Sequence, residues 1–485
     1  MLNKNISQFF DIVDENSTVT DIHTEGNRKF ITITKNLDHN LTCPLCGAKL
    51  HSKGKFSRHP NNQILQDGYI IELTVEGRRW KCSNSSCIYT YTDQFDFIDK
   101  RKRTTKIIVF QILMSLKDIN LSCVQIARMY NVSDTFVHQT FMKYVNLPRK
   151  KLTEHICVDE VYLNISPTCK YALVIMDFVT GDILDIVESR RKIYTESYFL
   201  SIPLEERDNV KYICCDMYDP YVNYSVKFFH NAAVITDSFH VLQWLLRLIN
   251  DYINKVKKRY QAKDKERLEK KNLQNNFDFK TIKESKEVFI LKKAKWVLLL
   301  HPNKWTYYES HWVAKLNQYM DTYDWEREFL QLDNHFKAIR DLKDLYEEFN
   351  DGFKNDLEGA AKRLDELIQI YKNSPIYLFK QFSNLLIKYH DSIVNSFTYV
   401  KNMNEDESIM RRLSNGPMES FNNIPSRLRT QSHGVDNFAF TRNRILWSIR
   451  DDAPILGTPR DNKEIYSPGK KRGNYNEYLK LDRDK

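Results

Sequence analysis

Apolar residues fall into two patterns along the chain: short continuous runs in its middle part and helically spaced stripes after them. Runs bounded by turn residues predict five strands, at about 155–165, 171–177, 183–187, 211–218 and 232–237. Stretches 195–200 and 239–249 predict helices, so the expected order of elements is βββαβαβα. Short turns such as Thr180-Gly181-Asp182 should join the first three strands into an antiparallel meander.

An acidic pair, Asp159 and Glu160, interrupts the first of these apolar runs. An ionised carboxylate in a core strand is costly unless a partner charge or a metal offsets it, so the pair marks a candidate site. Because side chains alternate across a strand, Asp159 should face the site and Glu160 the opposite side. The predicted order, with Asp216 at the tip of the fourth strand, is that of a ribonuclease-H-like core. In that layout the first and fourth strands are neighbours, so Asp159 and Asp216 should meet.

Other side chains near Asp216 compete with it for a role. A lone aspartate at a strand end is usually a turn residue, which is the simple alternative for Asp216. We interpret Asp219 as a loop residue and Asp237 mainly as the N-cap of the helix that contains Phe239. His240, one turn into that helix, either faces the site or packs on the surface. Asp237 and His240 are therefore candidate neighbours of the site.

From about residue 251 to 405, glycine and proline are scarce, charge is dense and apolar residues recur at helical spacing. This pattern predicts an all-α insertion with no catalytic motif of its own. Basic clusters at 255–259 and 263–271 are interpreted as solvated helix faces or, alternatively, as contacts with phosphate.

The segment after the insertion supplies a third acid, Glu419. Pro417 suits the first turn of a helix, where a glutamate complements the helix dipole. The sharper alternative makes Glu419 the third carboxylate of the site. Pro425 should kink or end this helix about one and a half turns beyond Glu419. Candidate contacts with a phosphate backbone follow, namely Asn422, Asn423, Arg427, Arg429, Arg442, Arg444 and Arg450.

The first hundred residues contain two cysteine pairs, Cys43 with Cys46 and Cys82 with Cys87. Gly47 suits the tight knuckle of a zinc ribbon, and a strand-like stretch at 69–76 lies between the pairs. Four thiolates in tetrahedral ligation would close the coordination shell of one structural zinc ion. The alternative is four free cysteines.

Two histidines and two arginines lie between the cysteine pairs. His51 or His59 is an alternative zinc ligand, although four thiolates already suffice. Arg78 and Arg79 follow the strand-like stretch and are candidate contacts with DNA.

Residues 121–138 predict two short helices joined by a tight turn. Ser122 should cap the first helix, Asn131 tolerates the left-handed turn, and Ser133 or Asp134 should cap the second. This is the helix-turn-helix arrangement, whose second helix can enter a major groove. An ordinary helical hairpin is the alternative. The side chains expected to face outward toward DNA are Thr135, His138 and Gln139.

Composition narrows the class of protein. The chain has 485 residues, enough for about three domains. Its 73 basic and 63 acidic residues give a net charge of +10, which favours a polyanionic partner only weakly. Nine cysteines, an odd number, argue against a disulfide framework. The sequence has no apolar run of membrane-spanning length and no signal pattern, so we expect a soluble cytoplasmic protein.

Seven motifs in a fixed order resemble the ISL-three family of bacterial insertion-sequence transposases, a DDE-type family with an N-terminal zinc finger and a helix-turn-helix. They are CPLCG with RRWKCSNSSC, CVDEVY, TGDILDIVESR, CCDMYDPY, ITDSFHV, LSNGPMESFNN and HGVDNFAFTRNRIL, spanning about residues 40–450. The resemblance implies that Asp159, Asp216 and Glu419 occupy the catalytic positions. The family's usual glycine after the glutamate is Ser420 here, and Ile424-Pro425 stands where basic residues are frequent.

The expected fold is multidomain α/β. A ribonuclease-H-like catalytic core, with a mixed five-stranded sheet and flanking helices, is interrupted by the all-α insertion and preceded by a zinc ribbon and a helix-turn-helix domain. The expected domains are an N-terminal region at 1–100 with the ribbon at about 40–95, the helix-turn-helix at 101–150, the core at 151–250 and 406–452, the insertion at 251–405 and a flexible polar tail at 453–485.

Three carboxylates suit the chemistry of phosphodiesters. Two divalent ions about 3.5–4 Å apart stabilise the attacking and leaving oxygens, and oxygen ligands favour magnesium, with manganese as a substitute. We expect Asp159 to bridge both ions, and Asp216 and Glu419 to favour one each. By the resemblance, the protein would bind the terminal inverted repeats of an insertion sequence, cleave there and join the ends to target double-stranded DNA.

Two other classes of function stay open. One is a catalytically inactive DNA-binding regulator derived from a transposase, although a protein that only binds DNA would gain nothing from buried acidic residues. The other is a ribonuclease-H-like nuclease that cleaves without joining. A tyrosine recombinase would need arginine and histidine motifs that the sequence lacks. Two DNA ends in one complex would make the protein at least a homodimer, associated with the bacterial nucleoid when bound to DNA.

Overall fold

A computed structural model of the chain describes residues 14, 16–38, 41–61, 64–66, 68–275, 284–401, 410–432 and 437–465. The chain divides into two compact units. The first combines Met1–Pro148, Leu163–Lys170 and Asn423–Lys485, and the second combines Arg149–Tyr162 and Tyr171–Asn422. Most of the predicted polar tail, from residue 466 onward, lies outside the described residues.

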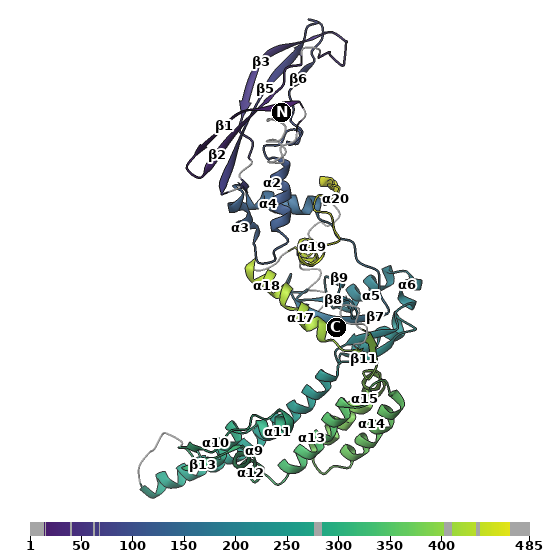
Figure 1. Cartoon of the computed structure of the whole chain (residues 1–485). Helices are drawn as coiled ribbons and strands as arrows, with labels where there is room; N and C mark the ends of the chain where they lie inside the picture. The colour runs from purple at the N-terminus through teal and green to yellow at the C-terminus, as the bar shows by residue number, and fades with distance from the viewer. Residues whose placement is uncertain are drawn as a thin grey trace. The chain divides into compact units, whose positions relative to one another are not determined.

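A six-stranded sheet occupies the N-terminal part of the first unit (purple in Figure 1). Its order is β1-β2-β5-β3, and β4 and β6 also pair with β5. The central strand β5 is the longest, and its residues Ile71, Leu73 and Val75 are buried at every second position, as expected for a strand with one covered face. The strands are β1 (Ser17–Glu25), β2 (Arg28–Lys35), β3 (Leu50–Arg58), β4 (Ile64–Gln66), β5 (Tyr69–Cys82) and β6 (Thr90–Thr92).

The helices of the first unit come from both ends of the chain. They are α2 (Lys106–Ser115), α3 (Cys123–Met129), α4 (Asp134–Tyr144), α18 (Asn423–Gln431), α19 (Phe438–Ile449) and α20 (Asn462–Ile465). Trp447 of α19 is buried and its indole N–H donates to the carbonyl of Leu113 in α2 at 2.9 Å. The C-terminal helix α19 is thus part of the same core as the N-terminal helices.

The turn between α3 and α4 has the local chemistry that the sequence predicts. The hydroxyl of Ser122 accepts from the backbone N–H of Gln125, whose side chain returns the bond, and the hydroxyl of Ser133 accepts from Phe136. Asn131 between the helices has φ +50°, the left-handed conformation expected of it. The predicted caps are therefore confirmed, with Ser133 rather than Asp134 as the second cap.

A five-stranded mixed sheet forms the centre of the second unit, in the order β11-β10-β7-β8-β9. Strands β7, β8 and β9 form the predicted antiparallel meander, whereas β10 and β11 run parallel to β7. The bounds are β7 (His155–Tyr162), β8 (Tyr171–Asp177), β9 (Ile183–Val187), β10 (Tyr212–Cys215) and β11 (Ala233–Thr236). All five predicted strands are present, and β8 and β9 have the predicted bounds.

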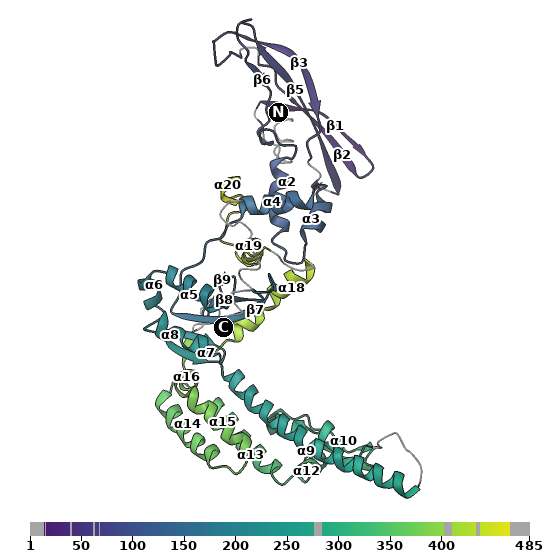
Figure 2. The ribbon, with the colours of Figure 1, turned by 180° about the vertical axis from the view of Figure 1, so that it is seen from behind.

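Short helices lie beside this sheet (Figure 2), and residues of α5, α7 and α8 share a buried cluster with its apolar side chains. They are α5 (Lys192–Ser201), α6 (Leu204–Asp208), α7 (Asp219–Val222) and α8 (Tyr224–Lys227). Phe199 of α5 packs with Leu173 and Ile213 of the sheet in one buried cluster. Asp219 begins helix α7, so the expectation that it is a loop residue is wrong; its carboxylate accepts from the Tyr389 hydroxyl at 2.8 Å and pairs with Lys388.

Helix α9 (Ser238–Asn275) extends far beyond the predicted 239–249. Its 38 residues correspond to about 57 Å at 1.5 Å per residue. Val241, Leu245, Ile249 and Ile253 recur on one face and are fully buried in the core of the insertion. None of the helices in the described parts of the chain combines the length and apolar character needed to cross a membrane.

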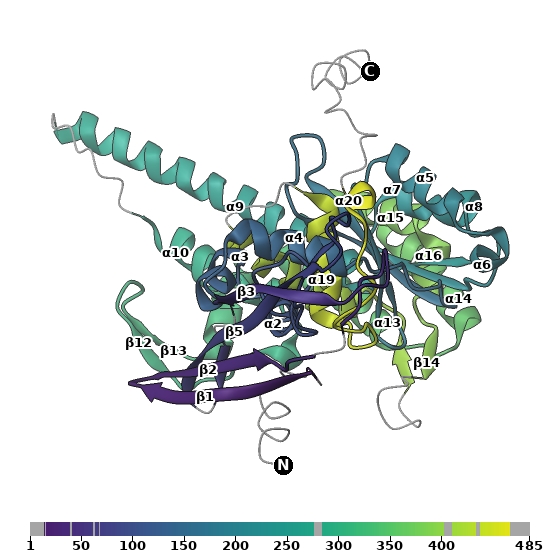
Figure 3. The same cartoon turned by 90° about the horizontal axis from the view of Figure 1, so that it is seen from above.

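The insertion is mainly helical, but the expectation of an all-α insertion is wrong (Figure 3). Strands β12 (His311–Val313) and β13 (Gln318–Met320) form a hairpin, because Asn317 adopts φ +54° and aromatic side chains favour paired strands. A second pair joins β14 (Tyr399–Lys401) to β15 (Met410–Arg412). The helical elements are α10 (Lys286–Lys293), α11 (Trp296–Leu299), the 3-10 helix η1 (Pro302–Lys304), α12 (Thr322–Leu330), α13 (Phe336–Asp351), α14 (Leu357–Lys372), α15 (Tyr377–Lys388) and α16 (His390–Asn395).

The insertion returns to the sheet through α16, which packs against the edge strand β11. The hydroxyls of Thr236 and Ser392 lie 2.7 Å apart, and the side-chain amide of Asn395 donates to the carbonyl of Val234 at 3.1 Å. These contacts cover the sheet edge next to β10, the strand that Asp216 follows. Helix α17 (Gly416–Phe421) follows β15 and packs against β7.

Candidate active site

Strand pairing brings the two predicted acids together. In the parallel pair of β7 and β10, Val158 is opposite Cys215, so Asp159 and Asp216 follow at adjacent positions. Burial, followed by the nearby charge of Asp216, raises the pKa of Asp159 to about 6 from its usual 3.8. Two carboxylates in these positions repel each other, and a divalent cation between them would relieve that repulsion.

Two asparagines hold the acids. The side-chain amide of Asn422 donates to Oδ2 of Asp159 at 2.9 Å. The side-chain amide of Asn415 approaches Oδ1 of Asp216 at 3.5 Å, and its backbone N–H donates to Oδ2 of Asp237 at 3.1 Å. Within the described residues, Oδ1 of each asparagine is buried and has no hydrogen-bond partner. The acids therefore sit beside buried oxygens that are free to accept from, or coordinate, a bound group.

Only one of the two asparagines is among the sequence-predicted residues. Asn422 was expected to contact DNA, and the structure instead places its amide on the carboxylate of Asp159. Asn415 was missed as a site residue. The available signal was its position just before the helix that carries Glu419, but position alone does not reveal that its amide lies beside Asp216.

His240 faces the site. Its Nε2 lies 2.8 Å from Oδ1 of Asp216, and this hydrogen bond raises the pKa of His240, although burial opposes the shift. Of the two alternatives left open by the sequence, the site-facing one therefore applies. Asp237 accepts from the backbone N–H of Phe239 at 3.0 Å and so caps α9, as predicted.

Glu160 lies on the opposite side of β7 from Asp159. The hydroxyl of Tyr221 donates to Oε1 of Glu160 at 2.5 Å, and Arg190 forms an ion pair with the same carboxylate. Burial and the charge of Glu160 raise the pKa of Tyr221, so its hydroxyl stays protonated. Glu160 is thus held by its own partners.

Glu419 lies on α17 and is exposed. It precedes Asn422 by three residues, so the two share a face of the helical segment that approaches Asp159. Among the described residues, the three carboxylates do not bring their oxygens within 4.8 Å of one another. Two ions about 3.5–4 Å apart do not require such close contact between their outer ligands. Helix α17 ends at Phe421, before Pro425, which occupies the first turn of α18.

The four cysteines of the first unit converge. Their sulfur atoms all lie within 4.8 Å of one another, with Sγ of Cys43 3.6 Å from Cys87 and Sγ of Cys46 3.4 Å from Cys82. Gly47 adopts φ +74°, which allows the knuckle after Cys46. Burial raises the pKa of Cys43, but hydrogen bonds from the backbone of Leu45 and Cys46 outweigh it and bring the pKa to about 7. This donor set fits one tetrahedral zinc ion.

The remaining predicted residues differ in exposure. Thr135, Gln139, Arg79, Asn423 and Arg427 are exposed, Arg78 and Arg429 are half-buried, and the ring of His138 stacks on Phe440 at 4.4 Å. His51 lies exposed on β3, and the ring of His59 bonds Thr74, so neither belongs to the cysteine cluster.

Three downstream arginines serve the fold of the first unit. Arg444 is 1% exposed and donates to the carbonyls of Asp118 and Leu121, while Arg442 and Arg450 donate to the carbonyls of Leu147 and Pro148. Burial lowers the pKa of Arg444 to about 10. The expectation that Arg444 and Arg450 contact phosphate is therefore wrong, because their side chains are buried against backbone carbonyls.

Comparison with known families gives a match to the part of the chain that contains the three acids. A family model described as Transposase, DDE_Tnp_ISL3, matches residues 156–445, more than half of the chain and the segment that carries all three acids. The protein is therefore a transposase of the DDE type. Within that class it belongs to the ISL3 family, as the ordered motifs indicated, and membership implies the use of divalent metal. No curated protein matches the chain significantly.

Proposed function

We propose that this transposase binds the terminal inverted repeats of an insertion sequence, cleaves DNA there and joins the freed ends to target DNA. The observation that carries the proposal is the pairing of Asp159 with Asp216 inside the matched segment. The raised pKa of Asp159, caused by burial and then by Asp216, supports a site built for bound cations.

In this proposal Asp159, Asp216 and Glu419 hold two magnesium or manganese ions. When bound, the ions would stabilise negative charge on the attacking and leaving oxygens of the phosphodiester. Asn422 fixes the orientation of Asp159 through its amide, and His240 holds Asp216 through Nε2. Hydrogen bonds of this kind orient metal ligands in other proteins and contribute about 10- to 100-fold to metal affinity or activity.

The sheet order supports a ribonuclease-H-like core. A meander of three antiparallel strands, followed by two strands parallel to the first, is the layout that the sequence predicts. In this order β7 lies between β8 and β10, so Asp159, the residue after Val158, is next to both neighbouring strands.

Recognition of the DNA ends is assigned to the first unit. The cysteine cluster would hold one structural zinc ion, and α3 and α4 would act as a helix-turn-helix with α4 in the major groove. Thr135 and Gln139 are exposed on α4 and can reach base edges, whereas His138 packs on Phe440. Exposed Arg79 and Arg427 are candidates for phosphate contacts.

This division of roles also implies where and with what the protein works. Both DNA ends must meet in one complex, so we propose a homodimer or larger assembly on DNA. The protein would act in the bacterial cytoplasm, on the nucleoid.

A strand-transfer assay tests the proposal. Labelled element ends, target DNA and magnesium should yield joined products with the native chain and none with Asp159→Asn. End binding, measured without divalent cation, should be the same for both proteins. Joining at the native rate by Asp159→Asn would disprove the carboxylate mechanism, and cleavage without joining would instead identify a nuclease.

A further inference from the structure

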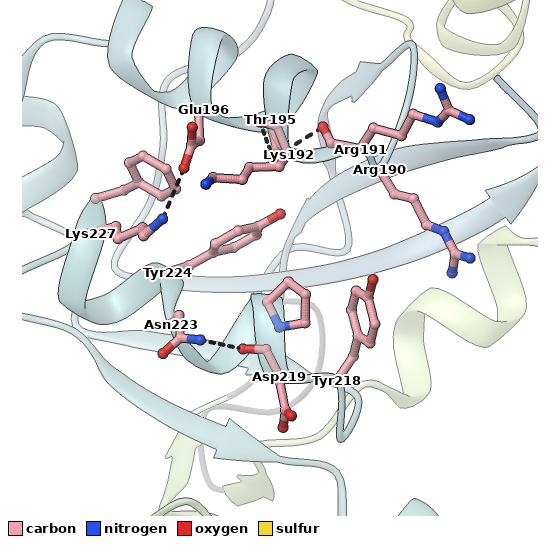
Figure 4. A pocket seen from close by; sticks show the side chains of 12 residues that line it. Arg190, Arg191, Lys192, Thr195, Glu196, Tyr218, Asp219, Asn223, Tyr224 and Lys227 are labelled. Atoms are coloured by element: carbon pink, nitrogen blue, oxygen red, sulfur yellow. Dashed lines mark hydrogen bonds and ion pairs between the residues drawn. The ribbon is translucent and has the colours of Figure 1, made fainter. Parts of the chain in front are cut away.

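A cavity of about 510 Å³ lies beside helices α5, α7 and α8, and its lining includes Arg190, one of the two partners of Glu160 (Figure 4). It is formed by the segment that enters α5 and by the α7–α8 segment. Six side chains define its character, namely Arg190, Lys192, Lys227, Tyr218, Tyr224 and Phe228. Its volume falls within the range of about 300–1,000 Å³ typical of ligand pockets. Neither the predicted acids nor the cysteine cluster uses this cavity.

The charge of the cavity is positive. Four of its lining residues are cationic and two are acidic. Each acid already engages an amine: Glu196 lies 2.9 Å from Nζ of Lys227, and Asp219 pairs with Lys388, which is outside the cavity. Lys192 and Arg190 are exposed, and Arg190 also pairs with Glu160, which does not line the cavity. A ligand with negative charge is therefore favoured.

One wall of the cavity is aromatic. Tyr224 and Phe228 are buried and pack with Phe199. Tyr218 is 40% exposed, and its ring packs edge-on against Tyr221, with centroids 5.0 Å apart. An exposed aromatic ring beside cations is the combination with which proteins bind bases together with phosphates.

The cavity is close in sequence to the candidate active site. Tyr218 follows Asp216 by two residues, with only Met217 between them. Arg190 pairs with Glu160, which lies on the opposite face of β7 from Asp159, and its guanidinium lies 5.8 Å from the ring centre of Tyr218. The cavity and the acids therefore approach each other at the end of β10, where Tyr218 follows Asp216. A strand of nucleic acid that reaches Asp216 would enter the cavity past this strand end.

We propose that this cavity binds one unstacked nucleotide of the DNA strand that runs to Asp159 and Asp216. Its phosphate would contact Arg190 and Lys192, and its base would lie against Tyr218. A base inside a duplex cannot enter a cavity, and a backbone phosphate alone would leave the aromatic wall unused. The inference deepens the proposed transposase function, since it assumes that DNA is the substrate.

Binding and crosslinking without divalent cation test the proposal. The probes are a short single-stranded oligonucleotide and its duplex, each with 5-iodouracil, a base that crosslinks on irradiation to aromatic rings beside it. Irradiation of the single strand with the full-length protein should crosslink Tyr218, as mapped by mass spectrometry of the peptides. Tyr218→Ala should weaken single-strand binding by roughly tenfold.

A charge reversal at the entrance gives a second readout. Lys192→Glu should reduce the slope of log affinity against log salt by about one. Matched controls on the insertion, Tyr323→Ala and Lys372→Glu, also replace exposed side chains, and they should bind and crosslink as the native chain does. Thermal melting confirms that each variant is folded.

The outcomes separate this proposal from the transposase function. Crosslinks confined to other regions, or native single-strand affinity in folded Tyr218→Ala, would overturn it. Weakened duplex binding by Lys192→Glu without any crosslink in the cavity would also overturn it, because the site would then contact backbone alone. Asp159→Asn should crosslink normally, so loss of strand transfer in that variant does not bear on the cavity.

Discussion

The cysteine cluster and the carboxylate site differ in how completely the protein gathers its ligand atoms. The four sulfur atoms lie within 4.8 Å of one another, and Cys43 and Cys82 are buried. The carboxylates of Asp159 and Asp216 are adjacent and half-buried, while Glu419 is exposed on a short helix. A set of ligands that is complete by itself suits a structural ion, whereas an incomplete one leaves room for a substrate.

The difference extends to the surrounding contacts. Cys82 ends β5 and Cys87 follows in the next loop, while Cys43 and Cys46 precede the Gly47 knuckle, so two short stretches of backbone bring the four residues together. Asp159 and Asp216 need Asn422, Asn415 and His240, which come from separate elements of the second unit. We infer that the first site depends on local folding and the second on the assembly of the whole sheet with α9 and α17.

The largest effect is expected at Asp159. Asp159→Asn should lower the rate of strand transfer by more than about 1,000-fold, because the proposed bridging ligand is lost while the fold is kept. Asp182→Asn, which replaces an exposed acid elsewhere in the sheet region, is the control and should transfer at the native rate. Equal rates of strand transfer for Asp159→Asn and Asp182→Asn would show that Asp159 matters no more for activity than an exposed acid elsewhere in the sheet region.

Next in size is the loss of a cysteine. Cys82→Ser should abolish zinc binding and destabilise the first unit by several kcal/mol, since binding of a structural zinc ion contributes directly to folding. Metal analysis and thermal melting measure the two effects. Cys123→Ser, outside the cluster, should keep both the zinc and the melting temperature. If the native protein contains no zinc and is no more stable than Cys82→Ser, the interpretation of the cysteine cluster as a structural zinc site is wrong.

A smaller effect concerns the pH dependence of stability. The pKa of Asp159 is raised from 3.8 to about 6, so the folded state binds a proton more tightly than the unfolded state. Its contribution to the free energy of unfolding should therefore fall as pH rises from about 4 to 6. At pH 7 without magnesium, Asp159→Asn should be more stable than the native protein by up to about 3 kcal/mol.

Urea denaturation at several pH values measures this difference. The buffers should be freed of divalent ions before protein is added, without a soluble chelator, so that the proposed zinc ion is not removed from the cysteine cluster. Added magnesium should narrow the gap between native protein and variant, because it stabilises only the ionised carboxylates. A native protein that is as stable as the variant throughout this range would show that Asp159 carries no burial cost.

The smallest effect separates two roles of Asn422. Asn422→Leu removes the hydrogen bond that lowers the pKa of Asp159, so the magnesium concentration needed for strand transfer should rise about 10- to 100-fold. Binding of DNA ends without metal should not change. Weaker end binding by Asn422→Leu would show instead that Asn422 contacts DNA. Asn423→Ala, which removes a proposed DNA contact, is the comparison variant for such weaker end binding.

Much of this architecture follows from the sequence, because it depends on local patterns. The bounds of β8 and β9, the caps Ser122 and Ser133, and the order of the five strands are written in short apolar runs and single polar residues. The length of α9 was missed because its polar second half lacks a continuous apolar stripe. The hairpin β12–β13 was missed because three-residue strands carry little periodicity.

The site is less predictable, since its contacts join residues far apart in the chain. The adjacency of Asp159 and Asp216 follows from strand order, but the contact of Asn422 with Asp159 spans 263 positions and has no local signature. Arg444 illustrates the opposite error. A basic residue near others resembles a phosphate contact, yet its environment of buried carbonyls is fixed by how α19 packs on the N-terminal helices.

Helix α9 belongs both to the candidate site and to the insertion. His240 is its third residue and contacts Asp216, and the helix continues for about 57 Å. Val241, Leu245 and Ile249 of the same helix are buried in the insertion core. The position of His240 beside Asp216 therefore depends on how the insertion packs, although the insertion supplies no predicted acid.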